Sequence, residues 1–345
     1  AGVLEHGSVE LLKSAGVGER IITDGIKHDG FLISSENESF RIDLSAATGK
    51  SVYVYGQTEV TIDLYKAQDK MKATIFHCVK DVNISDLNST KSKVQFKCLK
   101  ENYEITCDYI AGCDGSMGIS KNYIPKKIKK SHIINYPFSW LGILSNTKPV
   151  NDELIYASHE RGFALASMRN ENLSRYYIQT PHTDKIEHWP DELFWEELCI
   201  RLPKPYCRTL ERGKSIEKSV TKLRSLILEP MQWKNLFLAG DAAHIMPPTG
   251  AKGLNLAFSD IFYLSQGFIS YYKKGSSTKL NNYSKIALKR VWKTVGFSKW
   301  MTSILHNSNE NSLIERDLNK LELAELKKSE KAQKLVAEQY VGVAY

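Results

Sequence analysis

The stretch that decides the fold runs from Leu236 to Asn255 and reads LFLAGDAAHIMPPTGAKGLN. It begins with a wholly apolar run (236–239), which predicts a strand buried at the centre of a parallel sheet. Asp241 follows at the carboxyl end of that strand, where open α/β sheets bind their ligands. The carboxylate is therefore suited to accept hydrogen bonds from a ribose-like polyol.

The second half of this stretch predicts a turn and then a helix. Pro247 and Pro248 favour a rigid extended turn, because proline fixes φ and restricts the residue before it. The small residues at 249–253 would let the backbone approach a flat ring closely, and a helix is expected to begin near Leu254. Its free N–H groups would stabilise negative charge. A strand and loop without a ligand explains Gly240, but not the carboxylate, the prolines and the further glycines beside it.

Either side of this stretch, hydrophobic periodicity divides the chain into three parts. The first mixes predicted helices with strands in α/β fashion, the second has aromatic-rich strands typical of an antiparallel sheet, and the third is helical from Lys252 onward. The predicted helices are 8–15, 58–67 and much of 312–339. The predicted strands are 31–34, 51–55, 73–79, 94–98, 138–143, 153–157, 162–168 and 174–179, with 215–228 closing the second part.

Composition restricts the class of protein. With 42% hydrophobic and 25% charged residues, the 345-residue chain matches soluble globular usage and lacks a run of about 18 apolar residues. We predict a cytoplasmic protein without a membrane partner. The net charge of +8 favours anionic ligands, but the densest basic run (126–130) has no arginine and no interleaved aromatic, so no nucleic-acid partner is expected. Six cysteines without C-x-x-C spacing predict free thiols in a reducing compartment and no metal site.

Three short glycine motifs do not qualify as phosphate loops. Gly49-Lys50-Ser51 and Gly213-Lys214-Ser215 lack the upstream glycine of a P-loop. Gly16-x-Gly18 follows a predicted helix instead of a strand, and its third position is Ile21. None of them is interpreted as a nucleotide site.

The specific signal is a family resemblance. The stretch 236–255 resembles the second FAD-binding motif of the single-component flavoprotein aromatic hydroxylases, and Tyr109–Gly118 (YIAGCDGSMG) resembles their Asp-Gly motif, which serves FAD and NADPH. The family's first βαβ unit, with its Gly-rich loop, has no counterpart in these residues, which leaves FAD binding open.

The resemblance implies an α/β (α+β) fold with an N-terminally incomplete, Rossmann-like FAD-binding domain. An antiparallel-sheet substrate domain is inserted into it, and helices follow. The implied divisions are 1–135 for the FAD domain, 136–224 for the substrate domain, 225–255 for the return to the FAD domain, and 256–345 for a C-terminal helical and interface region. A homodimer through the C-terminal helices is also implied.

The resemblance further implies the residues that bind a para-hydroxylated benzoate. Ser167, Arg169 and Tyr177 match the positions that hold the carboxylate, which an arginine fork and two hydroxyl donors complement well. Tyr156 matches the tyrosine that hydrogen-bonds the phenol, and Pro248 is expected to turn its carbonyl toward the substrate hydroxyl.

A proton relay and a cofactor set are implied in the same way. Tyr340 and His28 match the relay partners of Tyr156, although taken alone the tyrosines would be packing aromatics and His28 a surface histidine. Arg175 matches an arginine near the isoalloxazine and Arg224 a contact of the nicotinamide cofactor. The other expected flavin contacts are Gln57, Asp114, Asp241, Gly250, Lys252, Gly253, Leu254 and Asn255.

The implied reaction uses NADPH or NADH, FAD and O2 to hydroxylate the ring beside the phenol, through a flavin C4a-hydroperoxide. Ser116 and Met117 depart from the family pattern at a pyridine-nucleotide contact, which leaves the choice of reductant open. Two alternatives also stay open: hydroxylation of another para-substituted benzoate, such as a 4-amino analogue, and a nonenzymatic benzoate-binding protein without a complete FAD site.

Overall fold

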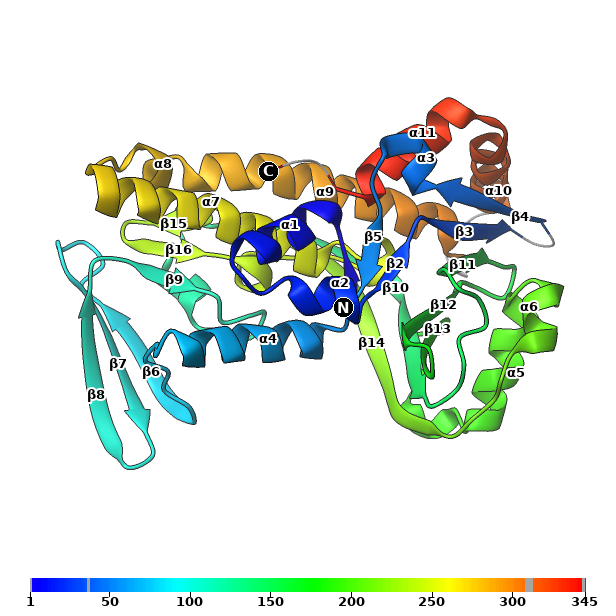
Figure 1. Cartoon of the computed structure of the whole chain (residues 1–345), viewed down its shortest axis with the longest axis horizontal. Helices are drawn as coiled ribbons and strands as arrows, with labels where there is room; N and C mark the ends of the chain where they lie inside the picture. Colours follow the sequence, from blue (N-terminus) through cyan, green and yellow to red (C-terminus); the bar gives the residue numbers. More distant parts are fainter. Residues whose placement is uncertain (1, 36–37, 308–312, 343–344) are drawn as a thin grey trace.

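The computed structural model describes residues 2–35, 38–307, 313–342 and 345. Within these residues the largest sheet has eight strands, in the order β17-β14-β10-β13-β12-β11-β3-β4. Figure 1 shows it curving below the long helices. Its strands are β3 (Gly30–Ser35), β4 (Glu38–Asp43), β10 (Lys130–Ser145), β11 (Ile155–Ser158), β12 (Ala164–Asn170), β13 (Leu173–Pro181), β14 (Ser215–Glu229) and β17 (His244–Ile245).

The strands predicted in the middle of the chain are confirmed, and they pair in antiparallel fashion from β14 through β11. The sheet as a whole is mixed, because β11 pairs in parallel with β3, with Tyr156 opposite Ile33. The sheet therefore takes strands from both sides of the boundary expected at residue 136. The proposed division into domains describes sequence segments and not separate sheets.

Alternation along the strands gives the sheet two apolar faces, since successive side chains point to opposite sides. On one face, Leu141, Ile155 and Ala164 pack against α5 (Asp191–Arg201). On the other, Trp140, Tyr156 and Leu165 pack with α9 (Tyr283–Leu305) and α11 (Glu330–Tyr340). This second face carries the candidate site.

A smaller sheet, β15-β16-β9, supports the motif stretch. β16 (Leu236–Leu238) is fully buried and central, parallel to β9 (Ile110–Gly112) and antiparallel to β15 (Gln232–Trp233), as its apolar run predicts. It packs against α7 (Gly253–Lys274), α8 (Thr278–Asn281) and α9. α7 begins within one residue of the predicted start and ends at Gly275, whose φ of +67° is the left-handed conformation that suits a C-terminal cap.

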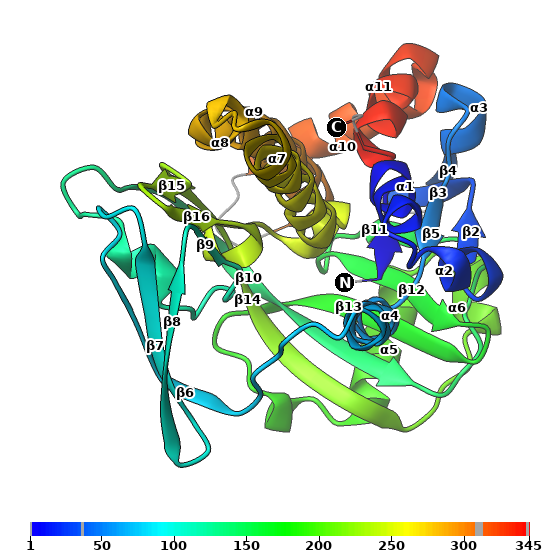
Figure 2. The same ribbon diagram turned by 60° about the vertical axis from the view of Figure 1, so that its left-hand side comes forward.

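In the N-terminal segment, β5 (Val52–Val54) lies between β1 (Val3–Leu4) and β2 (Ile26–His28) in a three-stranded sheet. The predicted helices are confirmed as α1 (His6–Ser14) and α4 (Gln57–Lys70), and the short α2 (Glu19–Thr23) follows α1. Figure 2 shows α4 viewed along its axis. The remaining strands form the projecting sheet β6 (Val79–Ser85), β7 (Ser92–Cys98) and β8 (Glu101–Cys107).

The C-terminal stretch predicted to be helical forms α10 (Leu313–Lys328) and α11. The Ser329 hydroxyl caps α11 by accepting from the Ala332 N–H at 3.2 Å. α11 packs on α3 (Leu44–Thr48), which brings Tyr340 beside the large sheet. α6 (Lys204–Thr209) follows α5, and short 3-10 turns lie at 120–123, 186–188, 240–242 and 248–250. Among the described residues, none of the helices is both long and apolar enough to span a bilayer.

Two predictions are wrong. Most of the predicted strand 73–79 is a loop, with Cys78 at a φ of +57°, and β6 begins only at Val79. The apolar residues of this segment are typical of a strand. In the structure, however, residues 73–78 pair with no described strand, and Phe76 packs on Phe96 and Tyr103. The six cysteines are not all free, because Cys199 and Cys207 form a disulfide between α5 and α6, with their Cα atoms 4.7 Å apart.

Candidate active site

A cavity of about 560 Å³ lies where the large sheet meets the motif stretch. Because β12 alternates, its side chains at 165, 167 and 169 share one face. The cavity contains ten of the residues predicted from the sequence: Gln57, Tyr156, Ser167, Arg169, Tyr177, Asp241, Pro248, Lys252, Gly253 and Leu254. Some of these residues lie on the large sheet and others in the motif stretch, which is far from it in sequence. Their meeting in one cavity supports their assignment to one site.

Arg169 supplies positive charge to the sheet wall. Its Nη1 donates to the Met168 carbonyl at 3.2 Å, and no ion pair joins it to a carboxylate among the described residues. Burial lowers the pKa of Arg169 below its ordinary value; the neighbouring Tyr177 opposes this shift, and the charge of Arg175 adds to it. A bound carboxylate would relieve this unfavourable burial of charge.

The predicted partners of Arg169 differ in where they lie. Tyr177 lines the cavity from β13, opposite Leu165 on β12. The Ser167 hydroxyl also lines it but donates to the Arg175 carbonyl at 2.7 Å, a cross-strand contact that a ligand carboxylate would have to replace or share.

Arg175 does not line the cavity, although it was predicted beside the flavin. Its Nε donates to the Tyr177 hydroxyl at 3.0 Å, its Nη1 pairs with Glu217 at 2.9 Å, and the guanidinium lies 5.0 Å from the Tyr177 ring centroid. Arg175 therefore orients Tyr177 in this structure.

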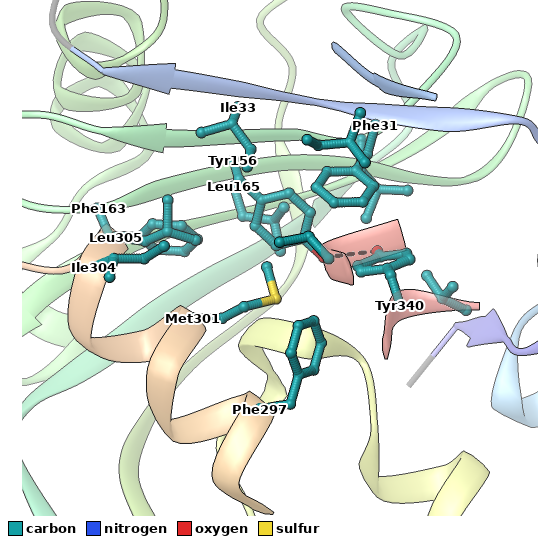
Figure 3. Close-up of a cluster of buried hydrophobic side chains, with 14 of the residues drawn as sticks. Phe31, Ile33, Tyr156, Phe163, Leu165, Phe297, Met301, Ile304, Leu305 and Tyr340 are labelled. Atoms are coloured by element: carbon teal, nitrogen blue, oxygen red, sulfur yellow. Dashed lines mark hydrogen bonds between the residues drawn. The ribbon is translucent and has the colours of Figure 1, made fainter. Parts of the chain in front are cut away.

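Tyr156 and Tyr340 form the predicted phenol pair. Their hydroxyl oxygens lie 2.9 Å apart, and Figure 3 shows the two rings within an apolar cluster that includes Phe31 and Met301. Burial raises the pKa of Tyr156, and burial followed by the Tyr156 hydroxyl raises that of Tyr340. Both phenols are neutral at pH 7, and only one of them can donate to the other at a time.

His28 is fully buried on β2, so its interpretation as a surface histidine is wrong. Neither of its ring nitrogens has a hydrogen-bond partner among the described residues, and burial lowers its pKa. The direct hydrogen-bonded chain therefore runs from Tyr156 to Tyr340 and stops before His28.

The motif stretch forms the opposite wall. Gly240 and Ala251 have φ values of +62° and +54°, which turn the backbone sharply on either side of the proline turn. Asp241 and Pro248 are exposed toward the cavity, and a Cβ added to Gly253 would meet nothing within 4 Å. This leaves open space beside the first turn of α7, whose N–H groups have no partner within the helix.

Two motif side chains have partners that the sequence did not predict. Lys252 Nζ donates to Glu5 at 2.6 Å and to the carbonyls of Gln339 and Tyr340 at 2.7 and 2.8 Å. Asn255 accepts from the Glu5 N–H at 2.8 Å and donates to the Val3 carbonyl at 2.9 Å. Both side chains tie the start of α7 to the chain ends, so only their backbone is left to contact a cofactor.

Asp260 and His244 stabilise the turn at Gly240 from the protein interior. Both are fully buried, and Asp260 Oδ2 lies 2.6 Å from His244 Nε2 while accepting from the Gly240 N–H at 2.9 Å. Sequence reasoning missed this pair, because its members are separated by the whole proline turn.

Three further predicted cofactor contacts lie outside the cavity lining. Asp114 Oδ2 accepts from the Ser120 N–H and hydroxyl at 2.9 Å each, so it caps the 3-10 turn, while its neighbours Cys113 and Gly115 line the cavity. Arg224 is exposed on β14, and Gly250 is buried behind the proline turn.

Trp140 and Gly2 are among the lining residues that the sequence did not predict. Trp140 is fully buried on β10, and Gly2 packs so closely on Arg169 that a Cβ would lie 2.6 Å from its Nη1. A tryptophan in a strand is usually core, and a glycine before a strand gives no signal of its own.

Comparison with known proteins identifies the family. A model described as an FAD binding domain matches residues 1–298. The p-hydroxybenzoate hydroxylase of Acinetobacter baylyi is 49% identical over 346 residues, spanning 100% of this chain and 85% of that protein. The chain belongs to the FAD-dependent aromatic hydroxylases. It is a flavin-dependent oxidoreductase that hydroxylates aromatic rings.

Two less similar proteins show how far the similarity extends. The mitochondrial ubiquinone biosynthesis monooxygenase COQ6 of Drosophila melanogaster is 21% identical, over 83% of this chain and 68% of that protein. The crystal structure of p-nitrophenol 4-monooxygenase from Pseudomonas putida superposes with a TM-score of 0.82 at 15% identity, covering 100% of this chain and 89% of that one. This last likeness establishes the fold.

The aromatic hydroxylases of this family use FAD. The cavity wall formed by the motif stretch (236–255) fits that cofactor. The open space at Gly253 and the unpaired N–H groups of α7 suit a flat, electron-accepting ring, and the exposed Asp241 carboxylate suits hydroxyl groups. We infer that Asp241, Gly253 and Leu254 would hold the flavin, with the sheet wall left for the aromatic substrate.

Proposed function

We propose that this protein hydroxylates 4-hydroxybenzoate at carbon 3 to 3,4-dihydroxybenzoate, with FAD as cofactor, NADPH or NADH as reductant and O2 as oxidant. The name and the 49% identity of the Acinetobacter relative support the substrate. Bound FAD supplies the transfer of electrons to oxygen, and the protein supplies position and electrostatics.

The observation that carries this proposal is that two strands of the large sheet bring two different polar groups into the cavity. Arg169 on β12 brings into the cavity a cation that has no carboxylate partner within the described part of the chain, and Tyr156 on β11 brings a buried phenol into the same cavity. 4-Hydroxybenzoate has an anion at one end and a phenol at the other. It therefore matches the two polar groups with its apolar ring between them.

The roles of the protein side chains follow from this match. Arg169, with Tyr177 and Ser167, binds the carboxylate, and Tyr156 hydrogen-bonds the substrate phenol and favours its deprotonated form. Tyr340 accepts or returns that proton through its 2.9 Å contact with Tyr156, and His28 is the proposed outer end of the path. Leu165 and the aromatic wall exclude water from the ring.

The test is turnover by the full-length protein reconstituted with FAD. NADPH oxidation, O2 uptake, H2O2 release and 3,4-dihydroxybenzoate should be measured together with 4-hydroxybenzoate as substrate. The proposal expects about one product per NADPH, together with a substrate-dependent change in the visible flavin spectrum. A normal flavin spectrum with NADPH consumption but no hydroxylated product would contradict it.

The same assay separates the two alternatives. Turnover of 4-aminobenzoate with a higher kcat/KM than 4-hydroxybenzoate would assign the enzyme to the amino analogue. Benzoate binding without any flavin spectrum would indicate the nonenzymatic alternative. Comparison of KM for NADPH and NADH would decide the reductant. The question is open because the exposed Met117 stands where the family pattern has a pyridine-nucleotide contact.

We also propose a homodimer through the C-terminal helices. Ile314, Leu318 and Leu321 of α10 lie at helical spacing and are 71%, 56% and 57% exposed, so an apolar stripe faces outward. Sedimentation should give a dimer, and Leu318→Glu should yield monomer. Leu99→Glu, on a surface leucine of the projecting sheet, should leave the dimer intact. A wild-type monomer would contradict this proposal.

We propose the cytoplasm as the location of the protein. Cell fractionation with a tagged chain tests this directly. Recovery in the membrane or exported fraction would contradict it.

A further inference from the structure

A polar stripe runs along the buried face of α9. Ser298, Thr302 and His306 follow one another at intervals of four residues, so they lie on the same side of the helix. Their exposed fractions are 0%, 1% and 2%. Buried polar groups are costly unless they are hydrogen-bonded, so the partners of this stripe are informative.

The first two residues of the stripe hold the proline turn. Ser298 Oγ donates to the Pro247 carbonyl at 3.1 Å, and Thr302 Oγ1 lies 2.9 Å from Thr249 Oγ1. These contacts flank Pro248, which lines the cavity. The position of Pro248 is therefore set from both sides by α9.

The third residue holds the sheet wall. Trp140 lines the cavity from β10, and its indole Nε1 donates to His306 Nε2 at 2.7 Å. Because an indole nitrogen can only donate, this contact requires an unprotonated Nε2. His306 Nδ1 then carries the proton and donates to the Thr302 carbonyl at 2.8 Å. Both ring nitrogens are satisfied by the neutral form.

Aromatic packing fixes the imidazole in its plane. The His306 ring stacks on Phe138, Phe163 and Trp140 with centroid distances of 4.6, 4.3 and 5.7 Å and interplanar angles of 9°, 25° and 13°. Burial lowers the pKa of His306 to about 3, which agrees with the tautomer that the hydrogen bonds require. The ring is one layer behind the cavity wall and is not part of its lining.

We propose that His306 is a positioning residue for hydroxylation: with Thr302 it fixes the Trp140 wall relative to the Pro248 turn and so sets the width of the substrate cavity. This inference rests on the proposed function. If the two walls separate, water reaches the reacting ring and oxygen is released as H2O2 instead of entering the product. Substrate affinity depends mainly on Arg169 and changes less.

The test compares two substitutions, of which only one leaves the Trp140 N–H with a hydrogen-bond acceptor. His306→Phe keeps the stacking but leaves the Trp140 N–H without an acceptor, whereas the amide oxygen of His306→Gln can still accept from it. We expect His306→Phe to lower product per NADPH about fivefold with a matching rise in H2O2, and the dissociation constant of 4-hydroxybenzoate to change by less than about twofold. His306→Gln should recover most of the yield.

The chain offers a matched control. His132 on β10 and Trp292 on α9 form an edge-to-face pair with centroids 4.9 Å apart, between the same two elements but outside the cavity. His132→Phe should leave the yield unchanged. Thr302→Val and Thr302→Ser provide a second pair, in which only valine should raise H2O2 release.

A measurement without turnover separates this inference from the proposed function. In ¹H–¹⁵N spectra, the Trp140 indole N–H should exchange with solvent at least tenfold more slowly in the wild-type holoenzyme than in His306→Phe. Equal exchange, or a variant yield equal to that of an active wild type, would overturn the role of His306. A wild type that makes no product while its Trp140 N–H is protected would contradict only the proposed function.

Discussion

The hydroxyl oxygens of Tyr156 and Tyr340 lie 2.9 Å apart although the residues are 184 positions apart in the chain. Tyr156 comes from the large sheet and Tyr340 from the end of α11, and both are fully buried. Since neither phenol reaches bulk water, we propose that a proton leaving the substrate passes to Tyr156. In this proposal the pair links binding of a phenol to its activation.

Tyr156→Phe should impair hydroxylation much more than flavin reduction. The substitution keeps the ring but removes the hydroxyl, so the substrate phenol loses its partner for deprotonation. We expect product formation to slow about 100-fold, and the rate of flavin reduction to change by less than about twofold. Stopped-flow absorbance with product analysis measures both.

Tyr136→Phe is the matched control, because the Tyr136 hydroxyl is also buried and contacts Ser225 at 3.3 Å on another part of the sheet. An unchanged product yield per NADPH in Tyr156→Phe would show that phenol activation does not depend on this hydroxyl.

Arg169→Ala should weaken binding of 4-hydroxybenzoate about 10- to 100-fold, the range for losing charge-assisted hydrogen bonds. Arg169→Lys should lie between alanine and the wild type, since lysine keeps the charge but not the planar fork. Titration of the flavin absorbance gives the dissociation constants.

Phenol, which lacks the carboxylate, serves as the control ligand for this pair. If Arg169→Ala weakens phenol as much as 4-hydroxybenzoate, the arginine supports the cavity without binding the anion. An unchanged constant for 4-hydroxybenzoate would remove Arg169 from the site.

Gly2→Ala should reproduce part of the Arg169 defect without touching the substrate. The new Cβ would lie 2.6 Å from Arg169 Nη1 and 3.1 Å from Cζ, so the end of the arginine side chain must shift. We expect about a fivefold weaker affinity for 4-hydroxybenzoate, with little change in thermal stability, because a flexible side chain yields more easily than backbone. Gly56→Ala is the control, since its Cβ would meet only Glu59 Cγ at 3.9 Å. Equal affinities in the two variants would contradict the effect.

The elements that the sequence predicted correctly are those with strong local patterns. The apolar run of β16, the strand expected at 162–168 and the start of α7 near Leu254 each depend on a few neighbouring residues. The loop at 73–79 shows the limit of this reasoning, because an apolar segment becomes a strand only if a partner strand is available.

The site shows a second limit, which is long-range contact. The grouping of Ser167, Arg169 and Tyr177 was predictable once the strands were placed side by side. The Trp140–His306 contact spans 166 positions and the Lys252–Glu5 ion pair spans 247, and no local pattern marks either of them. The family resemblance identified Lys252 as a cofactor position, but only the structure shows that its ammonium binds Glu5 and the end of α11.

The neutral state of His306 makes a prediction about stability and pH. Its pKa is about 3 in the folded protein against 6.5 ordinarily, so below pH 6.5 the unfolded chain binds a proton that the folded chain does not. Stability should therefore be complete above pH 6.5 and decline as the pH falls toward 3. At pH 5 the loss from this residue should be about 2 kcal/mol, because each pH unit contributes about 1.4 kcal/mol in this range.

Denaturant unfolding at pH 7 and pH 5 measures this loss, with His306→Gln as the comparison. Burial also lowers the pKa of His28 and His159, and these residues contribute equally to both proteins. The wild type should lose about 2 kcal/mol more than the glutamine variant between the two pH values, because only the wild type has the titrating ring. Equal losses would mean that the imidazole accepts a proton in the folded state. In that case the hydrogen bond from the Trp140 N–H to His306 Nε2 must be broken, since one nitrogen cannot accept from the indole and carry a proton at once.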